Sequence, residues 1–413
     1  MTSSITISVI IPAWNNWELT QTCLKGLAAT ADGITLEVIL VDNGSTDETP
    51  HSAPTLGTSL FGDSFKHLRL SENRGFAVAC NQGAQAATGR YLLLLNNDIF
   101  FTSGWLPPLL KALQQDSKLI GVGPLLVFPE NDRPRSGRVQ HLGITASVGP
   151  QFRHLYEMFP HSHPVTRKRR QLQVITGAAM LMPTRLFHAL GGFFEGFVNG
   201  MEDVDFCCRA IKSGGYFSVI PESCLIHLTS CTTGRFNHEQ HNMTLLLTRK
   251  PGAQEDDIRL AAEDGYRPTF TPWLDLALKL STEKQSEIEA NWSAKPDPAR
   301  LPELLQAEPL WDEGYALWTH HQPHNAAIAA ELRAILCPSI DAYHELARTL
   351  AEAGHSEQAA KTVKKIALIR DVLKDQAFLI RHARTLHGKT RDQATRDALN
   401  AWLAVHDGTT PSA

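Results

Sequence analysis

The stretch VILVDNGSTD, residues 38–47, predicts the fold of the N-terminal half of the chain. Its four apolar residues, Val38 to Val41, are typical of a strand covered on both faces, and a polar tip follows at once. Three further apolar runs are each followed by polar residues; they are Ile7–Ile11, Leu68–Leu70 and Tyr91–Leu95. Between the runs, Trp17–Ala29 and Phe76–Ala87 carry apolar residues three or four apart, which predicts helices. This alternation predicts an α/β fold with a mostly parallel sheet.

Four polar tips follow the four predicted strands. They are Pro12–Asn16, Asp42–Asp47, Ser71–Gly75 and Asn96–Asp98. Any one of them could be an ordinary turn, but ligands of open α/β sheets bind beyond the carboxyl ends of the strands. A carboxylate such as Asp42 can accept the imide N–H of uracil or thymine, and Asp98 can hold a divalent metal that bridges phosphates. The four tips together therefore predict a crevice for a nucleotide that carries a diphosphate.

Composition excludes several classes of protein. The 413 residues contain 39 Lys plus Arg against 43 Asp plus Glu, a net charge of -4, which argues against a nucleic-acid partner. With 43% hydrophobic and 20% charged residues, the chain has the composition of a globular protein. Its N-terminus lacks the pattern of a signal peptide, and its apolar runs are too short to span a membrane. The seven cysteines include no C-x-x-C pair, so we expect reduced thiols in a cytoplasmic protein.

A second structured block is predicted between residues 172 and 230. Its elements are the apolar segment Val174–Met182, a helix over Met201–Arg209, and short strands at Tyr216–Ile220 and Cys224–Leu228. The segment Pro129–Gln171 before it shows little periodicity and contains four consecutive basic residues, 167–170. These residues could form either a solvated loop or a flap that contacts an anion.

From about residue 255 the pattern predicts helix after helix. Residues Tyr343 to Ile366 have the spacing of one tetratricopeptide repeat, a helical hairpin that cannot bury its own apolar face. Residues Trp311–Leu336 fit a degenerate neighbouring hairpin, and Asp371–Val405 a closing helical pair. We therefore expect two domains, residues 1–250 and residues 251–413. The helical domain could contact a protein partner or the membrane surface.

The ordered motifs of residues 5–250 resemble the inverting, GT-A fold glycosyltransferases of family 2. The matching residues are Ser8–Asn15, Val41–Asp47, Asn73–Phe76 with Asn81, Leu94–Asp98, Ile175–Gly177, Gly191–Phe193, Glu202–Asp205 with Arg209, and His227. The chain is most similar to the branch that builds bacterial surface polysaccharides, which includes rhamnosyltransferase-like members. The resemblance implies a Rossmann-like nucleotide-sugar domain.

The resemblance also implies roles for individual residues. Contacts to the donor substrate are implied for Pro12, Ala13, Asn15, Asp42, Asn73, Arg74, Asn97, Asp98, Gly177 and Glu202. Asn97 and Asp98 stand in the place of the D-x-D motif, but Asn96 replaces its first carboxylate. Asp98 and His227 are the implied ligands of Mn²⁺ or Mg²⁺, although His227 also fits a buried histidine bonded to a carbonyl.

Asp203 is the expected general base. Inversion in one displacement needs a carboxylate within hydrogen-bond reach of the acceptor hydroxyl, on the face opposite the leaving diphosphate. Acidic residues at a helix start are also simply stabilising, and Arg209 on the same helix is expected to pair with an acidic neighbour. His238 and His241 are three residues apart but lack the further ligands of a zinc site.

These inferences predict the transfer of a sugar from a UDP- or dTDP-sugar to an acceptor hydroxyl in polysaccharide or glycoconjugate synthesis. The acceptor could be a glycan, a lipid-linked sugar or a protein. A lipid-linked acceptor would bring the protein to the inner face of the membrane as a peripheral protein. The alternative is a catalytically impaired scaffold that binds partners through its helical region, a reading suggested by the missing carboxylate at Asn96.

Overall fold

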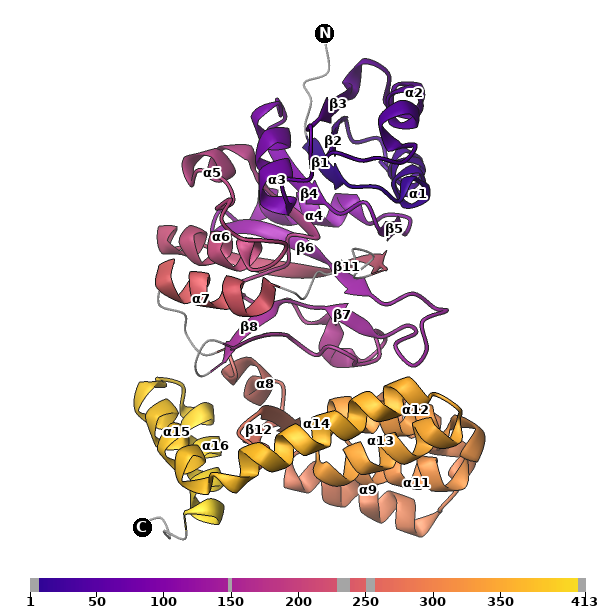
Figure 1. The fold of residues 1–413 in the computed structure, drawn as a ribbon, viewed down its shortest axis with the longest axis vertical. Helices are drawn as coiled ribbons and strands as arrows, with labels where there is room; N and C mark the ends of the chain where they lie inside the picture. Colours follow the sequence, from indigo (N-terminus) through magenta and orange to yellow (C-terminus); the bar gives the residue numbers. More distant parts are fainter. Residues whose placement is uncertain (1–6, 148–150, 229–237, 250–256, 408–413) are drawn as a thin grey trace.

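A nine-stranded sheet forms the centre of the N-terminal part of the protein (Figure 1). The computed structural model describes residues 7–147, 151–228, 238–249 and 257–407. The strands of the sheet are β1 (Ile7–Ala13), β2 (Leu36–Asp42), β3 (Phe65–Arg69), β4 (Tyr91–Leu95), β5 (Ile99–Phe101), β6 (Leu119–Val127), β7 (Val139–His141), β10 (Ala179–Pro183) and β11 (Tyr216–His227). The predicted α/β class is confirmed.

Most strands of this sheet run in one direction. The order is β3-β2-β1-β4-β10-β6-β11-β5, and β7 pairs with β6. Strands β1 to β4 are parallel, and β6 runs the same way because β10 is antiparallel to both β4 and β6. Strand β11 is parallel to β6. The carboxyl ends of β1, β2, β4 and β11 therefore lie at one edge, together with the start of β10.

Helices cover both faces of the sheet because the strands are apolar on both sides. One face packs against α1 (Trp17–Ala29), α2 (Thr49–Phe61) and α4 (Leu106–Gln115). The other packs against α3 (Phe76–Gln85), α5 (Thr184–Ala189), α6 (Glu202–Ala210) and α7 (Glu239–Arg249). The helices predicted at 17–29, 76–87 and 201–209 are confirmed, with ends shifted by two residues at most.

One expectation for the second block is wrong in detail. Tyr216–Ile220 and Cys224–Leu228 belong to the single strand β11, whose register against β6 shifts between Ile220 and Cys224. Pro221 lies in the shift and cannot donate to the ladder, so the sequence looks like two strands. Within the predicted apolar segment Val174–Met182, strand β10 begins at Ala179, after a turn at Gly177 and Ala178.

The C-terminal region is mainly helical. Its helices are α8 (Arg259–Glu263), α9 (Thr282–Ala294), α10 (Leu301–Ala307), α11 (Asp312–His321), α12 (Ala326–Leu336), α13 (Ile340–Glu352), α14 (Ser356–Lys374), α15 (Gln376–Lys389) and α16 (Gln393–His406). The predicted hairpins are confirmed as the pairs α11/α12, α13/α14 and α15/α16. None of the helices in the described ranges is both long and apolar enough for a transmembrane span.

A small hairpin interrupts this region and corrects the expectation of continuous helices. Strands β12 (Arg267–Phe270) and β13 (Leu276–Lys279) pair antiparallel. Pro268 and Pro272 disfavour a helix here, and Thr271 N donates to Asp275 O to close the turn at 2.8 Å. The predicted boundary at residue 250 lies outside the described residues and stays a prediction. One apolar cluster continues from the sheet to helices α10 to α12.

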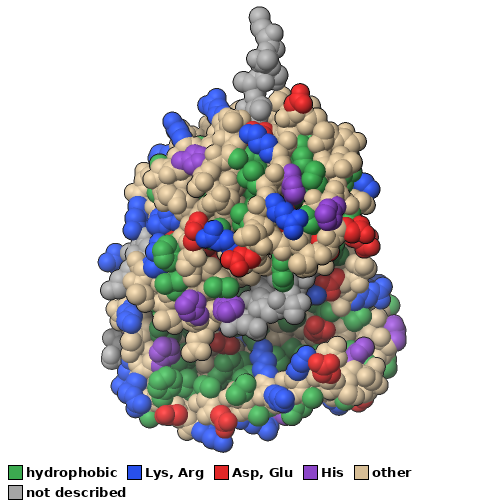
Figure 2. Space-filling model, turned by 45° about the horizontal axis from the view of Figure 1, so that its top comes forward, with side chains coloured by type: hydrophobic (Ala, Val, Ile, Leu, Met, Phe, Trp, Pro, Cys, Tyr) green, Lys and Arg blue, Asp and Glu red, His purple; other side chains and the backbone are tan. Residues whose placement is uncertain are grey.

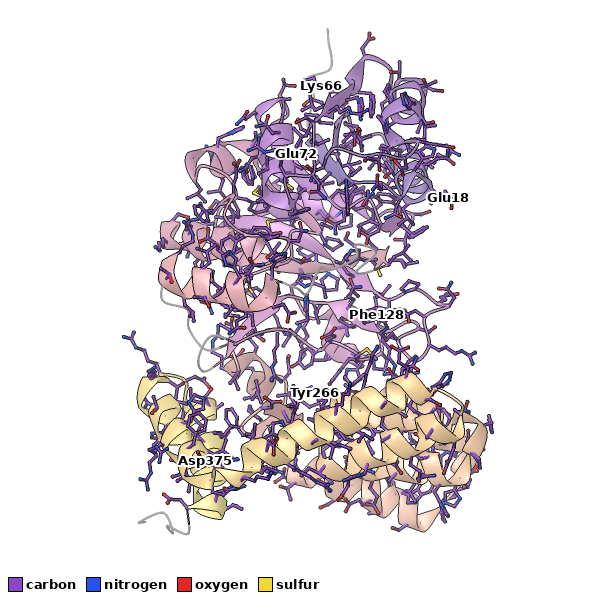
Figure 3. The ribbon with its side chains drawn as sticks, viewed as in Figure 1. Glu18, Lys66, Glu72, Phe128, Tyr266 and Asp375 are labelled. Carbon is purple, nitrogen blue, oxygen red and sulfur yellow. The ribbon has the colours of Figure 1, made fainter. Side chains whose placement is uncertain are left out.

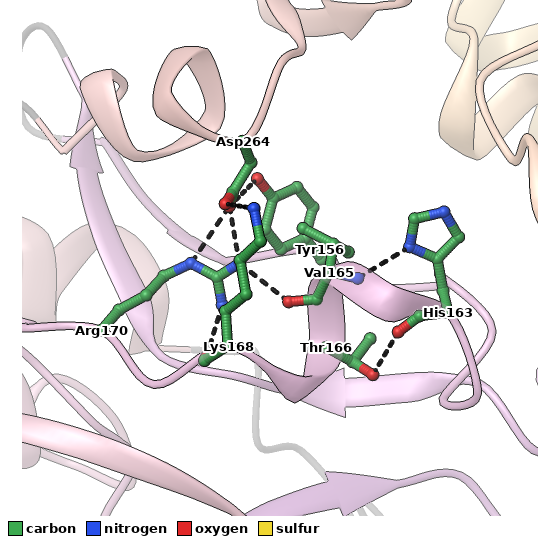
Figure 4. Close-up of polar contacts among 7 residues, drawn as sticks. All are labelled: Tyr156, His163, Val165, Thr166, Lys168, Arg170 and Asp264. Carbon is green, nitrogen blue, oxygen red and sulfur yellow. Dashed lines mark hydrogen bonds and ion pairs between the residues drawn. The ribbon is translucent and has the colours of Figure 1, made fainter.

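Two of the basic residues at 167–170, Lys168 and Arg170, join the two parts of the protein, as Figure 4 shows. Asp264, directly after α8, accepts hydrogen bonds from Lys168 Nζ (2.8 Å), Arg170 Nη2 (2.6 Å) and Tyr156 Oη (2.6 Å). Arg169 pairs with Glu222 at 2.9 Å. Arg167, Lys168 and Arg169 are exposed, as expected of a solvated loop, whereas the side chain of Arg170 is largely buried against Asp264. Tyr266, labelled in Figure 3, adds a ring contact to Tyr156 with centroids 5.7 Å apart.

Asp264→Asn should destabilise the protein by about 3 to 5 kcal/mol at pH 7, because it leaves the nearly buried Arg170 without its carboxylate. Burial raises the pKa of Asp264, but bonds from Lys168 and Tyr156 and the charge of Arg170 hold it below its usual value. The stabilisation is therefore present above about pH 3.9, the unfolded value, and is lost as the pH falls further. Urea midpoints at pH 7 and pH 3 measure this.

Glu222→Gln is the matched control for that experiment. Glu222 is 57% exposed and makes a surface pair with Arg169, so its loss should cost less than about 1 kcal/mol. The role given to Asp264 would be contradicted if the two variants lowered the urea midpoint equally at pH 7. It would also be contradicted if the midpoints of Asp264→Asn and the unmodified protein differed as much at pH 3 as at pH 7.

Candidate active site

The first group of predicted site residues lies at the carboxyl end of β2. Asp42 is fully buried; its Oδ1 accepts from Ser45 N at 2.8 Å, and its Oδ2 lies 3.7 Å from Arg69 Nε. Among the described residues, Oδ2 accepts no hydrogen bond. A buried carboxylate oxygen is costly unless it is bonded, so an N–H of a ligand would fit it. Because Asp42 is fully buried, a ligand reaches Oδ2 only if neighbouring residues move.

The neighbouring tips are bonded to one another. The Asn43 amide donates from Nδ2 to Asn73 Oδ1 at 2.9 Å and accepts at Oδ1 from Arg74 N at 2.9 Å. Asn15 Oδ1 accepts from Thr46 N at 2.8 Å. These bonds make one polar surface from three separate tips. The side chain of Arg74 is exposed on it.

Gly44 lets two of these tips approach closely. Its φ is 77°, in the left-handed region, and a Cβ there would lie 2.5 Å from Glu72 Cα. Pro12 and Ala13 lie within β1 and pair with Val41 and Asp42 of β2. The structure thus places both beside Asp42.

The second group is centred on His227, the last residue of β11. His227 Nδ1 lies 2.6 Å from Gln140 Oε1, and Gln140 Nε2 donates to the carbonyl of His227 at 3.1 Å, which fixes the orientation of the amide. The Oε1 atom can only accept, so Nδ1 carries the proton and Nε2 presents a lone pair in the neutral ring. That Nε2 lies 3.0 Å from Asp98 Oδ1 and 3.3 Å from Asn96 Nδ2.

Two acceptor atoms 3.0 Å apart repel unless a cation or a proton lies between them. One carboxylate oxygen and one imidazole nitrogen, with phosphate oxygens and water, form a plausible donor set for a divalent metal, and the pair fits the predicted use of Asp98 and His227. In the described residues no cluster of three His, Cys, Asp or Glu side chains could complete a metal site. Asn97 instead donates to Thr20 Oγ1 of α1 at 2.9 Å.

A third group lines a cavity of about 340 Å³ beside this pair. Asp203, near the start of α6, accepts from Gly177 N at Oδ2 (2.8 Å) and from Val204 N at Oδ1 (2.8 Å). A Cβ on Gly177 would lie 3.3 Å from Asp203 Cβ, so the glycine allows the close approach. Asn96 also lines the cavity, and its amide reaches His227. This cavity therefore adjoins the Asp98 and His227 pair.

Helix α6 holds its acidic residues in different environments. Glu202 is buried, lines the same cavity and accepts from Gly200 N at 2.7 Å. Asp205 points away and pairs with Arg209 and Arg249, each at 2.8 Å. The pairing expected of Arg209 is thus confirmed, and the pair between Asp205 and Arg249 joins α6 to α7. Asp203 instead faces the cavity, where the backbone amides of Gly177 and Val204 hold it, and remains the candidate base.

A pair of histidines lies beside the cavity, and one of the two, His154, lines it. His141 accepts from Thr176 N at Nε2 (3.3 Å), so its Nδ1 donates to His154 Nδ1 at 2.9 Å. Burial, with the nearby His154 and His227, lowers the pKa of His141 well below its usual value, which keeps the ring neutral. His154 lines the cavity. By contrast, His238 and His241 are exposed.

The site contains residues that sequence reasoning missed. Arg69 ends β3 beside Asp42, Asn43 ties the tips together, and Gln140 orients His227. Asn43 stands inside a recognisable motif and could have been found there. Gln140 and His141 lie in the segment 129–171, whose lack of periodicity gave no register from which to place them.

Comparison with known proteins supports the sequence resemblance. Residues 8–191 match the family model described as Glycosyl transferase family 2. The O-antigen biosynthesis protein RfbC of Myxococcus xanthus is 30% identical over 234 residues, which cover 55% of this chain and 17% of that protein. An N-acetylglucosaminyl-diphospho-decaprenol L-rhamnosyltransferase of Mycobacterium tuberculosis is 26% identical over 216 residues, 48% of this chain and 69% of that protein.

Among solved structures, the mannosyltransferase PcManGT from Pyrobaculum calidifontis, in complex with GDP-Man and Mn²⁺, aligns with a TM-score of 0.42 and 18% identity. The alignment covers 91% of this chain and 89% of that one.

Proposed function

We propose that this chain, whose residues 8–191 carry a glycosyltransferase family 2 domain, transfers a sugar with inversion from a nucleoside-diphosphate sugar to an acceptor hydroxyl. The observation that carries the proposal is the position of Asp203. Its carboxylate is held by Gly177 N–H in a cavity that Asn96 also lines, and the Asn96 amide contacts His227 of the Asp98 pair. A base and a site for the leaving diphosphate thus adjoin one cavity.

In the proposed reaction Asp203 accepts the proton of the acceptor hydroxyl as that oxygen bonds to C1 of the sugar. The bond between C1 and the diphosphate oxygen breaks at the same time, and the nucleoside diphosphate leaves with the bonding electrons. Gly177 N–H and the start of α6 orient the carboxylate before the reaction.

Asp98 and His227 would hold Mn²⁺ or Mg²⁺, with Gln140 fixing the imidazole and Asn96 beside it. When bound, the metal would neutralise negative charge on the leaving diphosphate. The tips around Asp42 would bind the nucleoside, with the Asp42 carboxylate accepting an imide N–H of uracil or thymine. This favours a UDP- or dTDP-sugar as the donor.

The names of the relatives suggest the biological setting. One is an O-antigen biosynthesis protein and the other a rhamnosyltransferase, so we place the reaction in the synthesis of a surface polysaccharide or another glycoconjugate. The proposed location is the cytoplasm, with peripheral contact to the membrane where the acceptor is lipid-linked.

Asp42→Asn should weaken UDP or dTDP binding about tenfold, because the amide is a weaker acceptor than the charged carboxylate for a ligand N–H. Asn retains an oxygen for Ser45 N–H, so the fold should survive. Calorimetric titration with UDP, dTDP and GDP measures the change. Asp63→Asn, an exposed carboxylate before the amino end of β3, is the control. Unchanged affinity in Asp42→Asn would exclude Asp42 from nucleotide binding.

A further inference from the structure

A second cavity lies between the α/β part and the helical region. It has a volume of about 440 Å³, within the range of ligand pockets, and is lined from β9 (Gln151–His154), α8, β13 and α12. Its walls are mainly apolar, with Leu155, Leu278 and Leu336 among them, and Ile335 is 45% exposed. Figure 2 shows apolar side chains gathered in a hollow toward the helical end of the molecule.

This cavity adjoins the one that contains Asp203. Phe152 and His154 of β9 line both cavities. On the paired strand β8 (Ile144–Ser147), Ile144 lines the cavity of Asp203 and Thr145 lines the second cavity, because successive residues of a strand face opposite sides. The β8/β9 hairpin is therefore a wall common to both cavities, and a molecule that passes it would contact both.

Five of the six polar side chains that line the second cavity are bonded to the protein. Arg153 Nη1 donates to Leu276 O at 2.8 Å, Tyr156 donates to Asp264, and Asp257 Oδ2 accepts from Ala146 N at 3.2 Å. Thr145 and His154 also bond to the protein. Glu157 is the sixth polar side chain of the lining, and no hydrogen bond to it is found among the described residues. A peptide in this cavity would lose hydrogen bonds to water without replacing them, whereas a hydrocarbon needs none.

We propose that the second cavity binds the apolar chain of a glycolipid acceptor, whose sugar hydroxyl then lies at Asp203. The proposal rests on the proposed function for the position of the sugar, but the affinity of the cavity for a hydrocarbon stands by itself. The shared β8/β9 wall brings the two cavities next to each other, so a chain that passes around it reaches both, and the apolar walls supply the affinity.

Binding of octyl β-D-glucoside, below its micelle concentration, and of methyl β-D-glucoside to the full-length protein tests the proposal by calorimetry without any donor. We expect the octyl compound to have a Kd at least about tenfold lower, since each buried methylene favours binding. Ile335→Glu places a charge at the mouth of the cavity and should remove this advantage. Leu368→Glu, on α14 at 67% exposure and outside the cavity lining, should retain it.

Ala277→Trp, which fills the cavity without adding a charge, provides a second variant if Ile335→Glu does not fold. Equal affinities for the two glucosides, or an octyl advantage that survives in a folded cavity variant, would overturn the proposal. Displacement of octyl glucoside by a short apolar peptide of lower Kd would also overturn it, in favour of a peptide acceptor. If the octyl advantage is found but no nucleotide sugar is a donor, the proposed function fails and the hydrocarbon site stands.

Discussion

Asp203→Asn should lower kcat about 100- to 10,000-fold while the Kd of the donor nucleotide changes little. The range is that of a general base, whose removal affects only the step in which the acceptor proton is transferred. Asn keeps one oxygen for either Gly177 N–H or Val204 N–H, so the turn at the start of α6 should persist. Turnover at saturating donor and acceptor, with calorimetry for the nucleotide, measures both quantities.

Two other carboxylates on the same cavity provide the contrast. Glu239 is exposed at its rim, and Glu202 is buried and bonded to Gly200 N. A larger loss of turnover in Glu239→Gln than in Asp203→Asn would transfer the role of base to Glu239. A melting temperature that falls together with kcat in Asp203→Asn would indicate a structural role for Asp203 instead.

Asp205 shows why proximity in sequence does not assign a role. It lies two residues from Asp203 on the same helix, yet it is fully buried between Arg209 and Arg249. Sequence reasoning separated these two carboxylates only through the family resemblance, because both occur at a helix start, where acidic residues are common.

The N-terminal fold could be predicted because its signals are local. A buried parallel strand is a short apolar run, and the tip after it is where the chain must reverse, as at Val41 and Asp42. Residues from four such tips then meet at one edge through strand direction alone. The hairpin β12/β13 was not predicted because its four-residue strands are too short to show a period within a helical region.

The supporting residues of the site could not be predicted from local signals. Gln140 reaches His227 across 87 positions of sequence, and His141 reaches Thr176 across 35. Such contacts depend on the register of β7 against β6, which shifts between Leu126 and Val127. The ion pairs of Asp264 have the same origin, because they join segments 94 and 96 positions apart.

Asp98→Asn should lower turnover at least about 100-fold and abolish saturable binding of Mn²⁺ in the presence of nucleotide. The structure gives the reason: Asp98 Oδ1 faces His227 Nε2 at 3.0 Å, and an amide there removes the charge that draws a cation to this pair. Chelation of the unmodified protein should likewise stop turnover, and added Mn²⁺ should restore it. Electron paramagnetic resonance of Mn²⁺ measures binding without reference to activity.

Gln140→Leu separates a metal role for this pair from a purely structural one. Loss of the bond to Nδ1 frees His227 to rotate and to change tautomer, and the loss of such a partner typically weakens metal binding about 10- to 100-fold. High Mn²⁺ should then rescue turnover in Gln140→Leu but not in Asp98→Asn. If Asp98 and His227 had only a structural role, both variants would melt at a lower temperature. No concentration of Mn²⁺ would then restore turnover in either variant. Because Asp98 is the single carboxylate of the Asn96-Asn97-Asp98 tip, the rescue distinguishes a weak metal site from no metal site at all.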